Sequence, residues 1–171
     1  MEFRVSVQRV VLAICFSIAA IGSVWAQGAA ISLGVKDHDS STPVEITSAE
    51  LELDQDTGTA IFTGDVIVAQ GDVTITTQRL VVEYGPDAET GQDEIKIIRM
   101  FDGVTFVSDA EAAESSNAVY TLAIDTIVMT GNVLVTQGRT ALSSDKLTYN
   151  LKSGEGLMEG NVKTILQQGN N

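Results

Sequence analysis

A ten-residue phrase occurs twice in this chain, with the two copies 67 residues apart. Residues 62–71 read FTGDVIVAQG, and residues 129–138 read MTGNVLVTQG. A repeat at fixed spacing indicates that one supersecondary unit has been copied, and stacked copies bury a core that no single copy could bury. The chain is therefore expected to fold as a row of similar units.

Four units can be traced by their apolar residues, because each has one apolar residue followed by two more at plus 5 and plus 7. The unit starts are separated by 29, 38 and 29 residues, and the excess of nine equals segment 85–93, which has loop composition. A glycine landmark follows at Gly64, Gly103, Gly131 and Gly160. The apolar sets are Ile46/Leu51/Leu53, Ile75/Leu80/Val82, Ala113/Ala118/Tyr120 and Leu142/Leu147/Tyr149.

The units are predicted to be β-hairpins. Val, Ile and Thr dominate segments 60–70, 73–84, 124–137 and 140–149, as half-buried strands prefer. Tight turns are expected at Gly71 and Gly138, which separate these segments. No helical period is evident after residue 30, so the protein should be essentially all-β.

Strand alternation assigns the apolar residues to faces. The step of five would put Ile75 and Leu80 on opposite faces of a regular strand, so we predict a bulge near Thr77 and near Ser144 that re-aims the side chains. The opposite face also carries the apolar residues Ile61, Ile67, Val128 and Leu134. The predicted inward face holds Phe62, Val66, Val68, Met129, Val133 and Val135, with Leu51, Leu80 and Leu147 behind.

The first 26 residues have the pattern of a secretory signal peptide. Arg4 and Arg9 precede an uncharged, mostly apolar run, and cleavage is expected after Ala26. An uncleaved anchor is the alternative, because no charge occurs in 10–35. The expected organisation is a flexible N-terminal segment at 27–42, one β-domain at 43–166 and a polar tail at 167–171. Without Cys15, residues 27–171 contain no cysteine and so no disulfide.

Charge and composition exclude several functions. Residues 27–171 have 8 basic and 22 acidic residues, a net charge of −14 that repels nucleic acid. His38, the only histidine, lies in a polar stretch, and no nucleophile–base pattern accompanies it, so we expect neither an enzyme nor a cofactor. Residues 54–58 resemble the start of a calcium loop but lack its distal glutamate, which favours a plain turn over a metal site. The acidic run 109–114 is expected to be a solvated loop.

Segment 43–165 resembles the OstA-like family of periplasmic lipopolysaccharide transport proteins. The resemblance rests on ITSAELELD at 46–54, the two copied phrases, SDKLTY at 144–149 and EGNV at 159–162. It implies an open, twisted β-jellyroll whose apolar interior holds the acyl chains of lipid A. On this resemblance, Phe62, Val66, Val68, Leu51, Leu80, Met129, Val133, Val135 and Leu147 are the candidate lipid-contacting residues.

The same resemblance implies assembly and partners. Similar proteins join end to end, head to tail with further copies, and pair with an LptC-like inner-membrane protein and an LptD-like outer-membrane protein. The expected function is a lipopolysaccharide carrier that bridges the two membranes, with the N-terminal edge toward the inner membrane. Two alternatives stay open: a membrane-anchored LptC-like component of the same pathway, and a structural β-repeat protein that binds no lipid.

Overall fold

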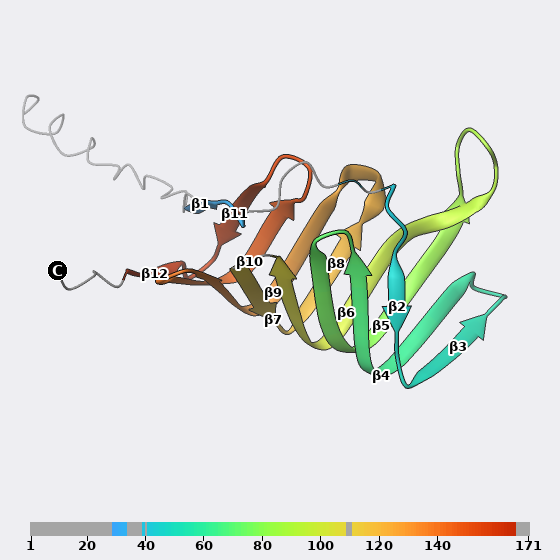
Figure 1. Ribbon diagram of the computed structural model, residues 1–171, viewed down its shortest axis with the longest axis horizontal. Coiled ribbons are helices and arrows are strands. Elements are labelled where there is room, and N and C mark those ends of the chain that lie inside the picture. Colours follow the sequence, from blue (N-terminus) through green and yellow to red (C-terminus); the bar gives the residue numbers. More distant parts are fainter. Residues whose placement is uncertain (1–28, 34–38, 40, 109–110, 167–171) are drawn as a thin grey trace, which may run out of the picture.

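The computed structural model describes residues 29–33, 39, 41–108 and 111–166, and these residues form β-structure almost throughout (Figure 1). The only helical element among them is a single 3₁₀ turn, η1 (Leu122–Ile124). The strands are β1 (Ala29–Ile31), β2 (Glu45–Thr47), β3 (Glu50–Asp54), β4 (Thr59–Gln70), β5 (Val73–Pro86), β6 (Asp93–Ser108), β7 (Glu111–Ser115), β8 (Asn117–Thr121), β9 (Thr126–Gln137), β10 (Thr140–Asn150), β11 (Glu155–Glu159) and β12 (Lys163–Leu166).

All twelve strands belong to one antiparallel sheet. Its order is β1-β11-β10-β9-β7-β6-β5-β4-β2, with β3 beside β4, β8 between β6 and β9, and β12 beside β10. Apart from β1, the chain runs through the sheet in sequence order, as expected for stacked hairpin repeats. The predicted all-β fold of hairpin units is confirmed.

Each repeat unit is bent at the same place. The ladder register shifts between Thr77 and Arg79 and between Ser144 and Lys146, so the two predicted bulges are confirmed. In the other two units, the equivalent bend divides the strand into β2 and β3 or into β7 and β8. Because of the bend, Ile75 and Leu80 are both buried despite their odd spacing.

A hydroxyl group closes the bend in every unit. Ser48, Thr77, Ser115 and Ser144 lie two residues after the four unit starts. Each serine hydroxyl donates a hydrogen bond to the carbonyl two residues ahead. The Thr77 hydroxyl lies 3.5 Å from the equivalent Arg79 carbonyl and makes its shorter hydrogen bond, 2.6 Å, to the Phe101 carbonyl. These donors recur at the 29, 38 and 29 spacing of the repeat. This recurring Ser or Thr is therefore a sequence signal for the bend.

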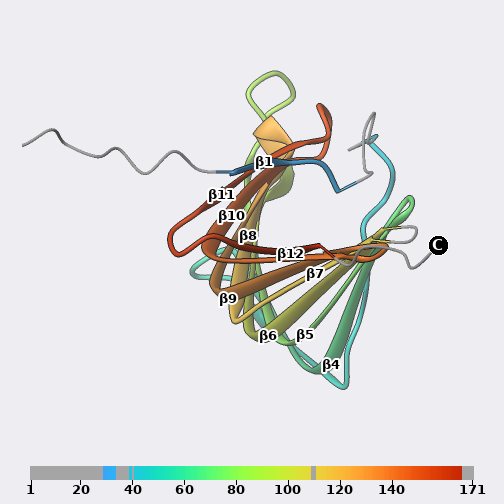
Figure 2. The ribbon, with the colours of Figure 1, turned by 90° about the vertical axis from the view of Figure 1, so that its left-hand side faces the viewer.

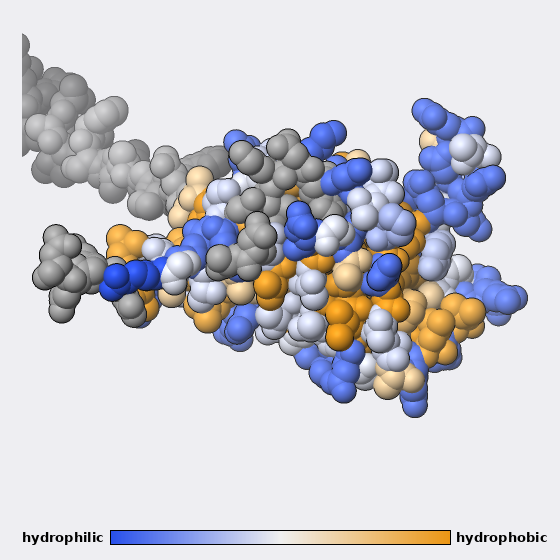
Figure 3. Space-filling model, in the orientation of Figure 1, coloured by the Kyte–Doolittle hydropathy of each residue, from blue (hydrophilic) through white to orange (hydrophobic). Residues whose placement is uncertain are grey.

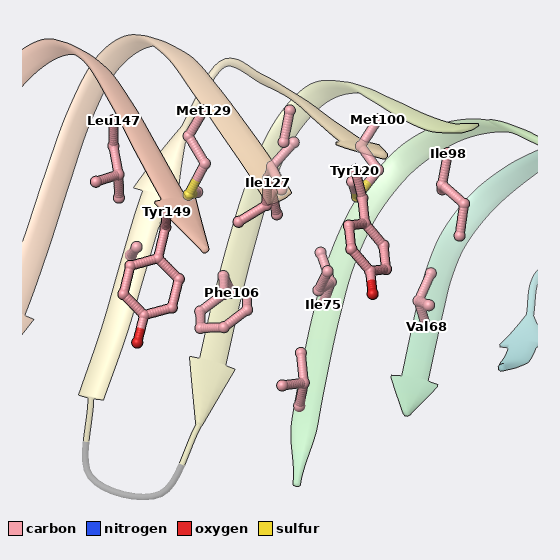
Figure 4. Close-up of a cluster of buried hydrophobic side chains, with 14 of the residues drawn as sticks. Val68, Ile75, Ile98, Met100, Phe106, Tyr120, Ile127, Met129, Leu147 and Tyr149 are labelled. Atoms are coloured by element: carbon pink, nitrogen blue, oxygen red, sulfur yellow. The ribbon is translucent and has the colours of Figure 1, made fainter. Parts of the chain in front are cut away.

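The bends fold the sheet into a trough with two arms (Figure 2). The β8 arm contains the short strands β3, β8 and β11, together with the halves of the long strands β4, β6, β9 and β10 that pair with them. The β7 arm contains the short strands β2, β7 and β12, together with the other halves of the same long strands. Side chains of the two arms face each other across the trough. Figure 4 shows Tyr120 and Met129 of the β8 arm pointing toward the side of the β7 arm that carries Phe106 and Ile75.

Two sequence-based expectations need correction. The insertion loop is only 87–92, because β5 continues through Pro86 and β6 begins at Asp93. Residues 111–114 of the acidic run are not a loop but lie in β7, where Ala113 is buried between β6 and β9. Within the expected flexible segment 27–42, Ala29–Ile31 pair with β11 and Leu33 is buried, and the flexibility of the segment stays a prediction.

Candidate functional site

The inner faces of the two arms form one continuous apolar surface. Alternation within each strand turns every second side chain inward, and the bend preserves that direction from one arm to the other. Buried hydrophobic residues from β4 through β11 all belong to this single cluster. The interior of the trough is therefore the candidate site.

The structure locates the nine predicted site residues as follows. Leu51 is an exception to the inward placement, because it lies on the end strand β3 and is 54% exposed. Phe62 is partly buried and packs against the core. The other seven are fully or almost fully buried: Val66, Val68, Leu80, Met129, Val133, Val135 and Leu147.

The opposite face is more exposed. Ile67 and Leu134 alternate with buried valines and are each more than a third exposed, whereas Ile61 and Val128 are half-buried. The face chosen from the sequence is thus the one that forms the core. Whether its residues contact lipid is not decided by burial and stays a prediction.

Sequence reasoning missed part of the interior. Ile98 and Met100 in β6 are buried there, but the insertion before β6 displaces them from the repeat spacing. Tyr120 and Tyr149 are unit landmarks at plus 7, and both face inward with at most 4% of their surface exposed. Their repeat positions could have identified them as site residues.

The two tyrosines differ in their hydrogen bonds. The Tyr149 hydroxyl accepts the backbone N–H of Leu33 at 3.2 Å. The buried Tyr120 hydroxyl has no hydrogen-bond partner among the described residues. Burial, with a smaller contribution from the negative charge of Asp125, raises the pKa of Tyr120 to about 12. An oxygen of a ligand in the trough would satisfy this hydroxyl, since a buried unpaired polar group is costly.

Little empty space remains between the arms. A cavity of about 10 Å³ is lined by side chains including Val68, Ile98, Tyr120 and Ile127. That volume holds no more than about one water molecule. Any acyl chain would therefore have to displace interior groups or separate the arms.

Residues 54–58, which resemble the start of a calcium loop, form a hydrogen-bonded turn. The Asp54 carboxylate accepts the N–H groups of Asp56 and Thr57, and hydrogen bonds from the Thr57 hydroxyl and from these amides lower its pKa. Asn150 makes the same contacts with Lys152 and Ser153 in the last unit. Within the described ranges, no cluster of three or more His, Cys, Asp or Glu side chains is arranged to hold a metal ion.

Apolar side chains also gather at the two ends of the sheet, over β3 and over β12 (Figure 3). Leu53 on β3 is 66% exposed, and Leu166 on β12 is 70% exposed. In the part of the chain that the structure describes, β3 pairs only with β4, and β12 pairs only with β10. Each end therefore presents an unpaired strand edge flanked by apolar side chains.

Comparison with known proteins shows which family the chain belongs to. Residues 45–155 match the family described as "LptA/(LptD N-terminal domain) LPS transport protein". The chain belongs to this family. It is 32% identical over 123 residues to the lipopolysaccharide export system protein LptA of Escherichia coli, a match that covers 67% of this chain and 63% of the E. coli protein.

Two further comparisons extend the similarity beyond the family segment. An uncharacterised protein of Rhizobium meliloti is 27% identical over 161 residues, covering 92% of this chain and 86% of that protein. The crystal structure of LptH, the LptA homologue of Pseudomonas aeruginosa, has a TM-score of 0.65 at 15% identity and covers 77% of this chain and 99% of that chain. This second match shows that the fold is the one expected for the LptA family.

The described residues include no helix of the length and apolarity needed to span a membrane. The expected signal peptide, its cleavage after Ala26, His38 and the polar tail at 167–171 lie outside the described residues. The E. coli and P. aeruginosa relatives are named as a lipopolysaccharide export system protein and as a component of a lipopolysaccharide transport device.

Proposed function

We propose that this protein carries lipopolysaccharide across the periplasm by holding its acyl chains between the two arms of the trough. The observation that carries the proposal is the continuous apolar surface that runs from β4 to β11 inside a member of the lipopolysaccharide transport family. Lipid A acyl chains are the matching ligand, because they are long and apolar and need a surface longer than one repeat. The sugars would remain outside.

The binding energy would come from apolar burial. The chain has a net charge of −13, so its overall field repels a phosphorylated lipid. Burial of each CH₂ group contributes about 0.8 kcal/mol. We therefore expect the dissociation constant to change by less than about threefold between 50 and 500 mM salt, because salt screens charges and leaves apolar burial in place. A steep loss of affinity with salt would contradict this mechanism.

The unpaired edges support a role as one link of a bridge. An exposed strand edge accepts a strand from another protein, and head-to-tail pairing that does not close produces a rod. The β2/β3 edge would receive an LptC-like inner-membrane partner or a preceding copy. The β12 end would receive a following copy or an LptD-like outer-membrane partner.

The proposal is tested by saturable binding of labelled lipopolysaccharide to the purified exported protein. Unlabelled lipopolysaccharide and ordinary phospholipid serve as competitors. Competition by lipopolysaccharide alone is the expected result. A folded, β-rich sample that assembles but binds no lipopolysaccharide would instead be a structural repeat protein.

A further inference from the structure

The N-terminal strand β1 is out of sequence order in the sheet. It pairs with β11 at the far end from β2, through Ala29 with Met158, Ala30 with Leu157 and Ile31 with Gly156. β1 therefore extends the β8 arm beyond β11, and Figure 1 shows it beside β11 at one end of the sheet. No repeat unit contains this strand, so its position needs a separate explanation.

Residues just after β1 are attached to both arms. Leu33 donates its backbone N–H to the Tyr149 hydroxyl of the β8 arm. Gln137 at the end of β9, in the β7 arm, donates its side-chain amide to the Ser32 carbonyl. Leu33 itself is 1% exposed and belongs to the same apolar cluster as the interior of the trough. These residues therefore connect the two arms and also fill space between them.

Gln137 belongs to the repeated ten-residue phrase and has an equivalent in the first copy. Gln137 is the ninth residue of the second copy, and Gln70 is the ninth residue of the first. Gln70 also donates its side-chain amide to the main chain before β2, to the Thr42 carbonyl at 2.9 Å. Gln70 is only 5% exposed, and a buried amide requires such partners. Equivalent glutamines 67 residues apart thus hold the same N-terminal stretch at two points.

Gly156 provides room for β1. A Cβ at this position would lie 2.8 Å from Ile31 Cγ1 and 2.9 Å from Tyr149 Cδ2, closer than real Cβ atoms approach other groups. The backbone of Gly156 is not in the left-handed region, so conformation does not require glycine there. The missing side chain instead allows Ile31 to pack against Tyr149.

We propose that residues 29–33 form a strap that closes the trough and must be displaced before lipid is bound. The inference rests on the proposed function and adds its regulation. Leu33 occupies apolar space that an acyl chain would use, and the strap holds the arms at the separation that leaves the interior almost filled. A three-residue strand with few hydrogen bonds is weakly held, so a ligand with large apolar area can replace it.

The test uses a disulfide that locks the strap. Ala30→Cys and Leu157→Cys are introduced together in a Cys15→Ser background, because these two residues are direct cross-strand neighbours and both side chains are exposed. The lock therefore leaves the interior unchanged. We expect the oxidised protein to bind labelled lipopolysaccharide at least tenfold more slowly than the same protein after reduction.

Single-cysteine variants under both conditions are the control for redox effects on the lipid or the fold. If oxidised and reduced forms bind lipopolysaccharide equally fast, the strap inference is wrong and the proposed function stands. If neither they nor the unmodified protein bind lipopolysaccharide, the proposed function fails, and the role of the strap fails with it.

A second variant tests the glutamine without a disulfide. Gln137→Ala should increase hydrogen exchange at residues 29–33. It should also accelerate lipopolysaccharide binding by about fivefold, because loss of one hydrogen bond raises the population of the displaced strap by about that factor. The matched control is Gln92→Ala, because Gln92 is exposed in the loop between β5 and β6. Unchanged exchange in Gln137→Ala, or an equal effect of the control, would overturn the inference.

Discussion

At the residue scale, the bends depend on small side chains and unusual backbone angles. Gly64, Gly103, Gly131 and Gly160 all have positive φ, and an Asp or Asn with positive φ adjoins each of them. Glycine and Asx are the residues that tolerate this conformation. The recurring Gly-Asx pairs could therefore be read from the sequence as bends. The strap could not, because residues 29–33 have no counterpart in any repeat.

We predict that Gly131→Ala destabilises the fold more than Gly138→Ala. Both glycines have positive φ, so each alanine carries backbone strain of about 1–2 kcal/mol. A Cβ at Gly131 would also lie 2.8 Å from Ser116 Oγ, whereas nothing lies within 4 Å at Gly138. Chemical denaturation should show an additional loss of about 1 kcal/mol or more for Gly131→Ala. Equal losses in the two variants would contradict the close approach at the bend.

The raised pKa of Tyr120 predicts a dependence of stability on alkaline pH. Between pH 10 and 12, the unfolded chain loses the Tyr120 proton while the folded protein retains it. The contribution of Tyr120 to the free energy of unfolding is therefore fully present below pH 10. It falls as pH rises to about 12, by at most about 2.7 kcal/mol. The free energy of unfolding should decline less steeply in Tyr120→Phe. Parallel declines in both proteins would show that Tyr120 is not responsible.

At the scale of single elements, repetition made the strands and their bends predictable. The predicted segment 140–149 differs from β10 by one residue, and the bulges at Thr77 and Ser144 follow from a spacing shared by four units. The predicted segment 124–137 begins too early, because its first residue belongs to η1. The inner face of β6 was missed because the insertion interrupts the spacing there. Local pattern alone also could not show how little space the interior leaves.

We predict that the hydroxyl at the bend of β5 stabilises the fold. Thr77 is buried, and its Oγ1 donates to the Phe101 carbonyl at 2.6 Å. Thr77→Val keeps the side-chain shape but removes this donor, and the expected loss is about 1–3 kcal/mol. Thr76→Val is the matched control, because Thr76 is exposed on the same strand. Thermal or urea unfolding should separate the two variants, and similar stabilities would show that the hydroxyl is dispensable.

At the scale of the whole molecule, the fold is a trough with two unpaired ends. The sheet does not close on itself, so β3 and β12 leave apolar side chains in solvent, which favours association with further copies or partners. End-to-end assembly was expected from the family resemblance and is supported by these edges. The strap at the β11 end was not expected, and its displacement would expose a further strand edge.

We predict that a charge at either end weakens self-association at least tenfold. Leu53→Lys changes the β3 end, and Leu166→Lys changes the β12 end. Leu134→Lys is the control, because Leu134 is exposed on the outer face of β9 in the middle of the sheet. Sedimentation over a range of concentrations measures the effect. Loss of association in the control alone would place the interface on the outer face instead.

Site-specific photocrosslinking can show whether acyl chains lie between the arms. A photoreactive phenylalanine analogue replaces Phe106, which points into the trough, or Leu134, which is exposed on the outer face of β9. After illumination with labelled lipopolysaccharide, we expect crosslinking at position 106 that unlabelled lipopolysaccharide suppresses, and little at position 134. Crosslinking at position 134 alone, or equally at both positions, would contradict an interior lipid site.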